Sequence, residues 1–171
     1  MKKQVNAFEY AGTICEAMKK GILVTVKNED FVNSMTIGWG TIGIEWSRPV
    51  FVAYIRESRY TREMLDAAGE FTVNIPLGEV DKNILSVCGT KSGRDLDKIK
   101  ELGLTLVDSE YVSAPGIQEL PLTLECKVIF RNVQDERTLP DNIRSRYYSA
   151  INEGDYHIAY YGEIVNAYIA Q

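Results

Sequence analysis

The sequence has few of the residues that build familiar catalytic and structural sites. Its three cysteines, Cys15, Cys88 and Cys126, are an odd number, lie far apart and include no C-x-x-C pair. Since His157 is the only histidine, neither a disulfide framework nor a zinc site is expected. No G-x-S-x-G motif accompanies that histidine, so hydrolases of the Ser-His-Asp and Cys-His types are also disfavoured.

Long apolar runs are missing as well. No stretch approaches the roughly 18 apolar residues that a membrane span needs, and no signal-peptide pattern precedes residue 20. A net charge of −5 disfavours nucleic acid and anionic membranes as partners, because both would repel the chain as a whole. We therefore expect a cytoplasmic protein that binds neither nucleic acid nor a membrane, and that holds any phosphate with a local group of basic residues.

The length and composition fit one globular domain. A chain of 171 residues that is 45% hydrophobic can bury a sizeable core, but it is too short for two domains of ordinary size. No internal repeat or low-complexity segment divides it. We expect residues 1–171 to form a single domain.

The spacing of apolar residues predicts mainly β structure with helical insertions. Strands are predicted at residues 22–27, 31–37, 50–55, 71–75, 122–133 and 156–169, the last interrupted by Gly162, and helices at 8–20, 59–68, 81–87 and 139–151. Strands at the start, middle and end, with helices between them, favour an antiparallel barrel. A parallel doubly wound sheet is disfavoured, because strands and helices do not alternate regularly and no G-x-G-x-x-G follows a strand.

Residues 33–61 contain most of the features of a ligand site. The segment starts as extended chain with Gly38, Gly40 and Gly43, where main chain can approach a planar ligand closely and Trp39 and Trp46 can form a wall. An apolar strand then leads to a polar corner at a predicted helix start, made of Arg56, Ser58, Arg59, Tyr60 and Thr61. Two guanidinium groups and three hydroxyls at a helix N-terminus indicate a phosphate site.

A second cationic helix start follows at Thr90-Lys91-Ser92-Gly93-Arg94. Ser92 and Asp95 also fit the capping-box pattern for a charged surface helix that Gly103 ends, and a well-capped helix is the alternative interpretation. The short distance from the first corner favours the interpretation in which both corners hold one phosphate.

Three motifs in this order and spacing carry a family resemblance. They are N-S-M-T-I-G-W-G from Asn33, R-E-S-R-Y-T from Arg56 and C-G-T-K-S-G-R-D from Cys88. From about residue 6 to residue 168 the chain resembles the flavin reductase-like family of FMN-binding split barrels, which includes the flavoredoxins. The resemblance implies a six-stranded antiparallel split β-barrel, a homodimer with one FMN per subunit near the dimer interface, and redox chemistry at the flavin.

The resemblance also implies which residues bind FMN. Along the isoalloxazine ring it places Asn33, Ser34, Met35, Thr36 and Trp39, and around the ribityl chain and phosphate it places Ser58, Arg59, Tyr60, Thr61, Lys91 and Ser92, with Arg56, Cys88 and Thr90 beside them. For Met35 and Trp39 ordinary core packing is the alternative. No residue is assigned to catalysis, because the flavin itself performs the hydride and electron steps.

His157 and Cys88 each have two interpretations. A lone histidine in an apolar strand is more often structural, but H-I-A-Y-Y-G-E-I resembles the closing strand of the family, where the histidine lies near the flavin. A buried cysteine is usually a small hydrophobe. If Lys91 and Arg94 lie close to Cys88, they would lower its thiol pKa and make a thiolate available. Both residues stay possible contributors to the chemistry.

The sequence leaves three functions open. The first is an FMN-dependent oxidoreductase that takes reducing equivalents from NADH or NADPH and passes them to free flavin, ferric iron or another small acceptor. The second is a flavoredoxin-type electron carrier that works with a redox protein, and the third is a non-redox flavin-binding protein. No nicotinamide fingerprint is visible, so the electron donor stays open.

Tyrosines gather in the C-terminal quarter, at positions 147, 148, 156, 160, 161 and 168. Aromatic residues with a polar tip are enriched at protein interfaces, although filling one barrel's core is an alternative use for them. Tyr160 and Tyr161 are adjacent and must point to opposite faces of a strand, so at least one face outside the barrel interior is aromatic. We expect the partner subunit of a homodimer to cover that face.

Overall fold

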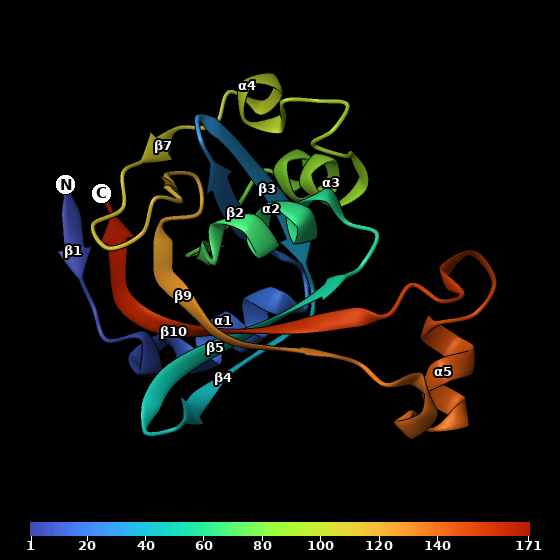
Figure 1. The fold of residues 1–171 in the computed structure, drawn as a ribbon. Helices are drawn as coiled ribbons and strands as arrows, with labels where there is room; N and C mark the ends of the chain where they lie inside the picture. The colour runs from blue at the N-terminus through green and yellow to red at the C-terminus, as the bar shows by residue number, and fades with distance from the viewer.

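The chain folds around one strongly curved antiparallel sheet (Figure 1). The computed structural model describes all residues from 1 to 171. In chain order its elements are β1 Lys2–Gln4, η1 Ala7–Tyr10, α1 Ala11–Met18, β2 Ile22–Asn28, β3 Phe31–Ile37, β4 Gly40–Glu45, β5 Arg48–Arg56, α2 Tyr60–Ala68, β6 Glu70–Ile75, α3 Lys82–Thr90, α4 Lys98–Leu102, β7 Leu106–Val107, β8 Gly116–Ile117, β9 Leu122–Val133, η2 Glu136–Thr138, α5 Asp141–Tyr147, η3 Ala150–Asn152 and β10 His157–Ala170.

The main sheet has the order β3-β2-β6-β9-β10-β5-β4, with β1 paired to β10. Strands β3 and β4 are at opposite ends of this order, but only Gly38 and Trp39 separate them in the chain. The sheet therefore curls until its two ends lie close together, which gives the split barrel predicted from the sequence (Figure 1). It has eight strands where six were predicted, because β4 and the three-residue β1 join the six predicted strands.

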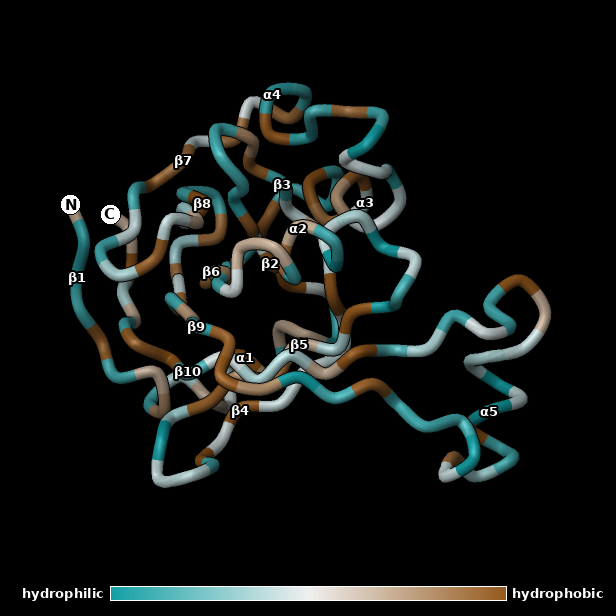
Figure 2. The backbone as a smooth tube through the Cα atoms, viewed as in Figure 1, coloured by the Kyte–Doolittle hydropathy of each residue, from teal (hydrophilic) through white to brown (hydrophobic).

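The barrel interior holds the main apolar core. Phe51, Phe71 and Tyr160 from three strands are almost completely buried there, and Ile14 of α1 and Leu65 of α2 join the same cluster. Figure 2 shows the hydrophobic segments concentrated on the strands of the barrel. The two helices therefore use their apolar faces to cover the barrel, as the spacing of their residues predicts.

Gly162 marks a β-bulge in the long strand β10. The register with β9 shifts between Tyr161 and Gly162, which confirms the predicted interruption. A Cβ atom at Gly162 would lie 2.6 Å from the Phe71 ring and 2.8 Å from Cβ of Cys126. Only glycine lets the bent strand approach the core this closely.

The predicted helices are present, but some of them begin or end at other residues than predicted. Gly69, at a φ of 68°, ends α2 as predicted, whereas α5 covers only part of residues 139–151. The interpretation of Ser92 and Asp95 as a capping box is wrong. Asp97 caps α4 by accepting a 3.1 Å hydrogen bond from the Lys100 N–H, whereas the Ser92 hydroxyl accepts from the Arg94 N–H within a turn.

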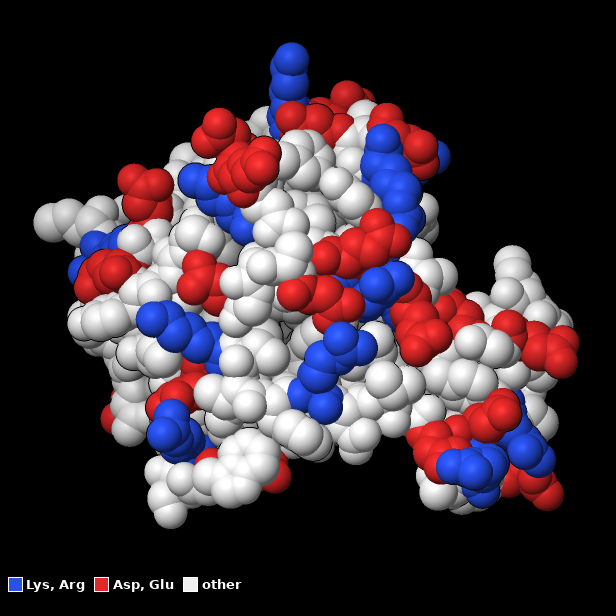
Figure 3. All heavy atoms as spheres, in the orientation of Figure 1, with Lys and Arg blue, Asp and Glu red and all other residues white.

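Residues 134–156, which we call the arm, connect β9 to β10 and project beyond the barrel (Figure 1). The arm carries α5 and is mostly hydrophilic along that helix (Figure 2). In the same orientation the surface carries positive and negative groups interspersed, on the arm as on the barrel (Figure 3). No helix of the structure has both the length and the apolar character required to cross a lipid bilayer.

Candidate functional site

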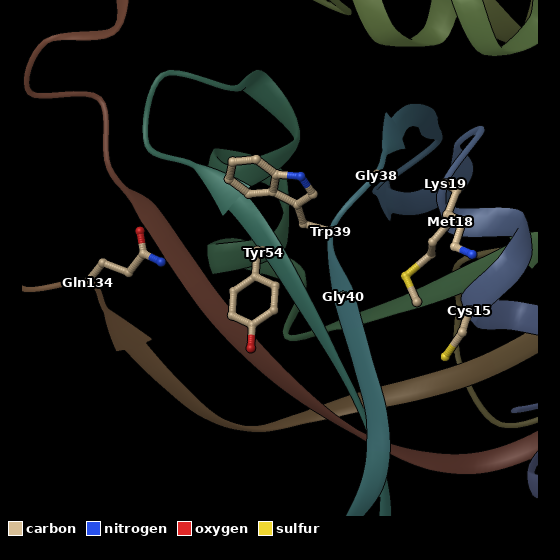
Figure 4. Close-up of a pocket in the computed structure, with 8 residues that line it drawn as sticks. All are labelled: Cys15, Met18, Lys19, Gly38, Trp39, Gly40, Tyr54 and Gln134. Carbon is tan, nitrogen blue, oxygen red and sulfur yellow. The ribbon is translucent and has the colours of Figure 1, made fainter. Parts of the chain in front are cut away.

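A cavity of about 170 Å³ lies where the two ends of the sheet meet. Its lining is Met35, Thr36, Ile37, Gly38, Trp39, Tyr54, Arg56, Arg59 and His157. A more open hollow of about 460 Å³ shares Gly38, Trp39 and Tyr54 with it (Figure 4). The fold thus brings together residues from β3, β5, the start of α2 and the start of β10 that the sequence separates by up to 122 positions.

Trp39 forms the aromatic wall between the two hollows. It follows β3, and 41% of its surface is exposed, so its ring is not core filling. Its centroid lies 4.7 Å from that of His157 and 5.1 Å from that of Tyr147, to which it is perpendicular. Met35 by contrast is buried in the barrel core, which confirms the core interpretation. It also borders the cavity, so its contact with a flavin stays a prediction.

The N-terminus of α2 lies beside the cavity and carries an exposed cation. Arg59 is the N-cap residue and no side chain caps the first turn. Its guanidinium makes one long contact, 3.4 Å from the Gly89 carbonyl oxygen at the end of α3. Uncapped N–H groups with a free guanidinium favour an anion, as the sequence predicted.

Asn33 lies under this corner with one unpaired atom. Its side-chain N–H donates to the Thr61 hydroxyl at 2.8 Å, but its Oδ1 is buried without a hydrogen-bond partner. A Cβ atom at Gly93 would lie 2.3 Å from that oxygen, so the turn at Gly93 closes over it. The structure therefore brings Thr61 and the 90–94 segment together, as predicted for the two halves of a phosphate corner. Asn33 lies between them and is not among the residues that line the cavity, whereas the family resemblance placed it along the flavin ring.

The side chains of Ser34 and Thr36 point away from Asn33 and Met35, because successive residues of a strand face opposite sides. The Ser34 hydroxyl is fully buried and hydrogen-bonded to Thr25 at 2.7 Å, within a polar network centred on Asn74. Ser34 can therefore offer only its backbone to the cavity. Thr36 borders the cavity, but its hydroxyl donates to the Leu85 carbonyl of α3 at 2.7 Å.

Arg56 and Ser58, predicted to bind the cofactor, hold the arm in this structure. The Arg56 guanidinium donates to the carbonyl oxygens of Asp155 and Tyr147 at 2.7 and 3.0 Å. The Ser58 N–H and hydroxyl both donate to the Asp155 carboxylate, at 2.9 and 2.8 Å. Arg56 still borders the cavity, whereas Ser58 has no free donor to give to a phosphate.

The second corner contributes fewer free groups than the sequence predicted. The Thr90 hydroxyl donates to the Ser86 carbonyl, and the Arg94 guanidinium pairs with Glu63 and lies over the Tyr60 ring. The Lys91 side chain is exposed and unpaired, and the Ser92 hydroxyl keeps its own proton available as a donor. Arg59, Lys91 and Ser92 are therefore the side chains free to meet an anion.

Cys88 is a buried thiol beside a buried lysine. Burial raises the pKa of the Cys88 thiol, and Lys98 partly offsets this effect. The prediction that Lys91 and Arg94 lower its pKa is therefore wrong, since the cation that acts on it is Lys98 and burial outweighs that cation. Lys98 is only 3% exposed, its own pKa is lowered by burial, and it donates to the Lys91 carbonyl oxygen at 3.3 Å. Nothing in the charged segment around Lys98 distinguishes this lysine from its exposed neighbours.

His157 borders the cavity as a neutral ring. Burial and then the charge of Arg56 lower its pKa to about 4. Its Nδ1 lies 2.7 Å from the Tyr148 hydroxyl of the arm, which in turn donates to Oε1 of Gln134 at 2.6 Å. Gln134 and Tyr148 are functional candidates that the sequence did not reveal, because the arm must fold before they meet His157.

The sequence was compared with known proteins and structures. Residues 18–171 match the family described as "Flavin reductase like domain". An uncharacterised protein of Archaeoglobus fulgidus is 36% identical over 107 residues, or 63% of this chain and 59% of that protein. The chain spans 51–66% of the length of three curated relatives.

Solved structures share the fold. The flavoredoxin of Desulfovibrio vulgaris (Miyazaki F) superposes with a TM-score of 0.66 at 24% identity, covering 88% of this chain and 69% of that one. The Streptomyces globisporus NADH:FAD oxidoreductase SgcE6 gives a TM-score of 0.63 at 18% identity, covering 88% and 75%. Since the family match extends over all but the first 17 residues, the chain belongs to the flavin reductase-like family.

Proposed function

We propose that this chain binds FMN and acts as a flavin-dependent oxidoreductase. The observation that carries the proposal is the aromatic-walled cavity that adjoins an uncapped helix N-terminus and the free guanidinium of Arg59. That combination suits a ligand with a planar ring at one end and a phosphate at the other. Membership of the flavin reductase-like family supports the same ligand.

The donors and acceptors present fit FMN. Arg59, the first N–H groups of α2, Lys91 and Ser92 would bind the phosphate, and the backbone from Met35 to Trp39 with the Trp39 indole would orient the ring. When bound, FMN would supply the hydride and electron chemistry, and the protein would bind and orient it.

The small size of the cavity in one chain favours a homodimer in which the partner extends it. Its volume of about 170 Å³ is below the ~300–1,000 Å³ of ordinary ligand pockets. Trp46, Phe130 and Tyr161, which we call the outer aromatic group, contact one another on the opposite side of the sheet from the core. We propose that a second subunit covers this group and completes the cavity wall.

We favour a small molecule over a redox protein as the electron donor or acceptor. The hollow of about 460 Å³ beside the cavity gives a small molecule direct access to the Trp39 and Tyr54 wall (Figure 4). The name of the Streptomyces neighbour, an NADH:FAD oxidoreductase, agrees with this assignment. The name of the other neighbour, flavoredoxin, keeps the electron carrier as the second candidate.

Steady-state oxidation of NADH and NADPH, with and without added FMN, tests the proposal. We expect turnover of at least one nicotinamide that depends on FMN. A bound flavin that ignores both nicotinamides but accepts electrons from ferredoxin would instead establish the carrier. A flavin that binds but cannot be reduced by either route would overturn the redox function.

Selectivity among flavins tests the cavity itself. Because the corner at Arg59 suits a terminal phosphate dianion, FMN should bind more tightly than riboflavin or FAD. Titration by quenching of flavin fluorescence measures all three affinities. Riboflavin binding as tight as that of FMN would contradict a phosphate site.

A further inference from the structure

Three residues form a hydrogen-bonded chain at the base of the arm. Gln134 directly follows β9, Tyr148 directly follows α5, and His157 opens β10. Oε1 of Gln134 is 2.6 Å from the Tyr148 hydroxyl and 3.3 Å from the backbone N–H of His157, and that hydroxyl is 2.7 Å from Nδ1 of His157. The chain is shielded from water, since Tyr148 is 4% exposed and His157 is 6% exposed.

The direction of each hydrogen bond follows from chemistry. A backbone N–H can only donate, so the side-chain atom of Gln134 that faces His157 must be the amide oxygen. Tyr148 therefore donates its single hydroxyl proton to that same oxygen. The Tyr148 oxygen has only lone pairs left for His157, so Nδ1 of His157 must be the donor in the remaining bond.

A neutral imidazole has one N–H, and here it lies on Nδ1. Burial and the charges of Arg56 and Arg59 keep the ring neutral at pH 7, and the only carboxylate that opposes them is Asp155. Nε2 is then a bare acceptor. It makes no hydrogen bond to the protein, and the ring borders the cavity beside Trp39.

We propose that Gln134 and Tyr148 are positioning residues that hold His157 as its Nδ1–H tautomer, so that the cavity presents a bare Nε2 to an N–H or O–H group of the bound ligand. The tautomer follows from the hydrogen bonds among Gln134, Tyr148 and His157 and does not require a bound ligand. The acceptor role rests on the proposed function, because FMN offers such donors in its ring and ribityl chain. The site would thus offer the cation of Arg59 to an anionic group of the ligand and the Nε2 lone pair of His157 to an uncharged N–H or O–H donor.

Because His157 is the only histidine, ¹⁵N-labelled histidine gives a single ring to observe by NMR. In the flavin-free protein at pH 7 we expect a protonated Nδ1 and an unprotonated Nε2, whose resonance lies far downfield. Protonation of Nε2, or a mixture of the two tautomers, would overturn the assignment.

Variants of Gln134 separate positioning from general packing. In Gln134→Leu the Tyr148 hydroxyl is free to donate to Nδ1, so we expect the tautomer to reverse and Nε2 to become protonated. Gln134→Glu keeps an acceptor oxygen and should retain the wild-type spectrum. The matched control is Tyr156→Phe. It removes a hydroxyl that donates to Glu136 and leaves the hydrogen bonds among Gln134, Tyr148 and His157 intact. An unchanged tautomer in a folded Gln134→Leu variant would contradict the proposal, and if that variant does not fold, the wild-type spectrum decides it.

Addition of FMN tests the acceptor role. We expect the Nε2 resonance to move upfield as the nitrogen accepts a hydrogen bond, and Gln134→Leu to weaken FMN binding about three- to tenfold, the cost of one lost hydrogen bond. An Nε2 resonance that does not move while fluorescence shows bound FMN would overturn the acceptor role alone. If FMN does not bind, the proposed function and the acceptor role fail together, whereas the tautomer is still judged on the flavin-free spectrum.

Discussion

Arg59 is the arginine of this region whose guanidinium contacts neither a carboxylate nor the arm. Arg56 is engaged by the arm and Arg94 by Glu63, while Arg59 makes one 3.4 Å contact to a carbonyl. A charge-assisted hydrogen bond is worth roughly 1.5–3 kcal/mol. Arg59→Ala should therefore weaken FMN by about one to two decades, as measured by fluorescence quenching. Arg94→Ala is the matched control and should change the affinity much less. Full affinity in a folded Arg59→Ala protein would place the phosphate elsewhere.

His157 should also make stability depend on pH. In the unfolded chain its ring takes up a proton near pH 6.5, whereas in the folded protein its pKa is held at about 4. Between these values the unfolded state binds more protons, so the free energy of unfolding rises with pH. The stabilisation is fully present above about pH 6.5 and is lost as the pH falls through 4. Urea unfolding at pH 7 and pH 5 should show a larger loss for the wild type than for His157→Gln. Equal losses in the two proteins would contradict the lowered pKa.

The sequence identified the individual residues of the site better than their partners. Trp39, Arg59 and His157 are recognisable because they lie in motifs whose spacing resembles a known family. Ser34 shows the limit of this approach, because the face of the sheet to which a strand residue points depends on the register of the strand. The Ser34 hydroxyl points into the polar network around Asn74. Lys98 shows another limit, because a lysine becomes buried only through tertiary packing, which local charge patterns do not reveal.

Among the elements, strands and helices were predictable, α5 of the arm included, but the position of the arm was not. Alternating apolar residues and Gly69 or Gly103 fix where most elements lie, because these signals are local. No local signal fixes where the arm lies, since its position depends on Arg56 and Ser58, nearly 100 residues earlier in the chain. Those two residues were predicted to bind a ligand because a polar corner looks the same whether it holds a phosphate or another segment.

The Asp155 carboxylate should be one of the contacts that hold the arm to the barrel, beside those of Arg56. It accepts both the N–H and the hydroxyl of Ser58, so Asp155→Ala leaves two donors unpaired and frees the base of the arm. We expect faster hydrogen–deuterium exchange within residues 134–156, with unchanged exchange in the β6–β9 pairing. Glu153→Ala removes a nearby exposed carboxylate and serves as the control. Equal protection of the arm in Asp155→Ala and wild type would contradict this role.

For the whole molecule, the two adjacent tyrosines of β10 are the basis of the proposed homodimer. Tyr160 is buried in the core and donates to Asp66, whereas Tyr161 lies on the opposite face against Trp46 and Phe130, which confirms that they point in opposite directions. Trp46 is 56% exposed and Phe130 is 44% exposed, so this outer aromatic group still presents apolar surface to water. The same face continues through Tyr54 to the wall of the cavity. A partner that covers the group would therefore also close the site.

We expect the protein to be a homodimer whose interface includes the outer aromatic group. Light scattering coupled to gel filtration at micromolar concentration should give about twice the chain mass of 19.3 kDa. Trp46→Lys places a charge in this apolar surface, so the measured mass should fall toward that of one chain. The affinity for FMN should also fall, because the partner subunit would no longer complete the cavity wall. Tyr111→Lys alters an equally exposed aromatic ring outside this group and should leave the dimer intact. A wild-type mass near 19.3 kDa with FMN fully bound would show that one chain suffices, and that the aromatic surface has another purpose.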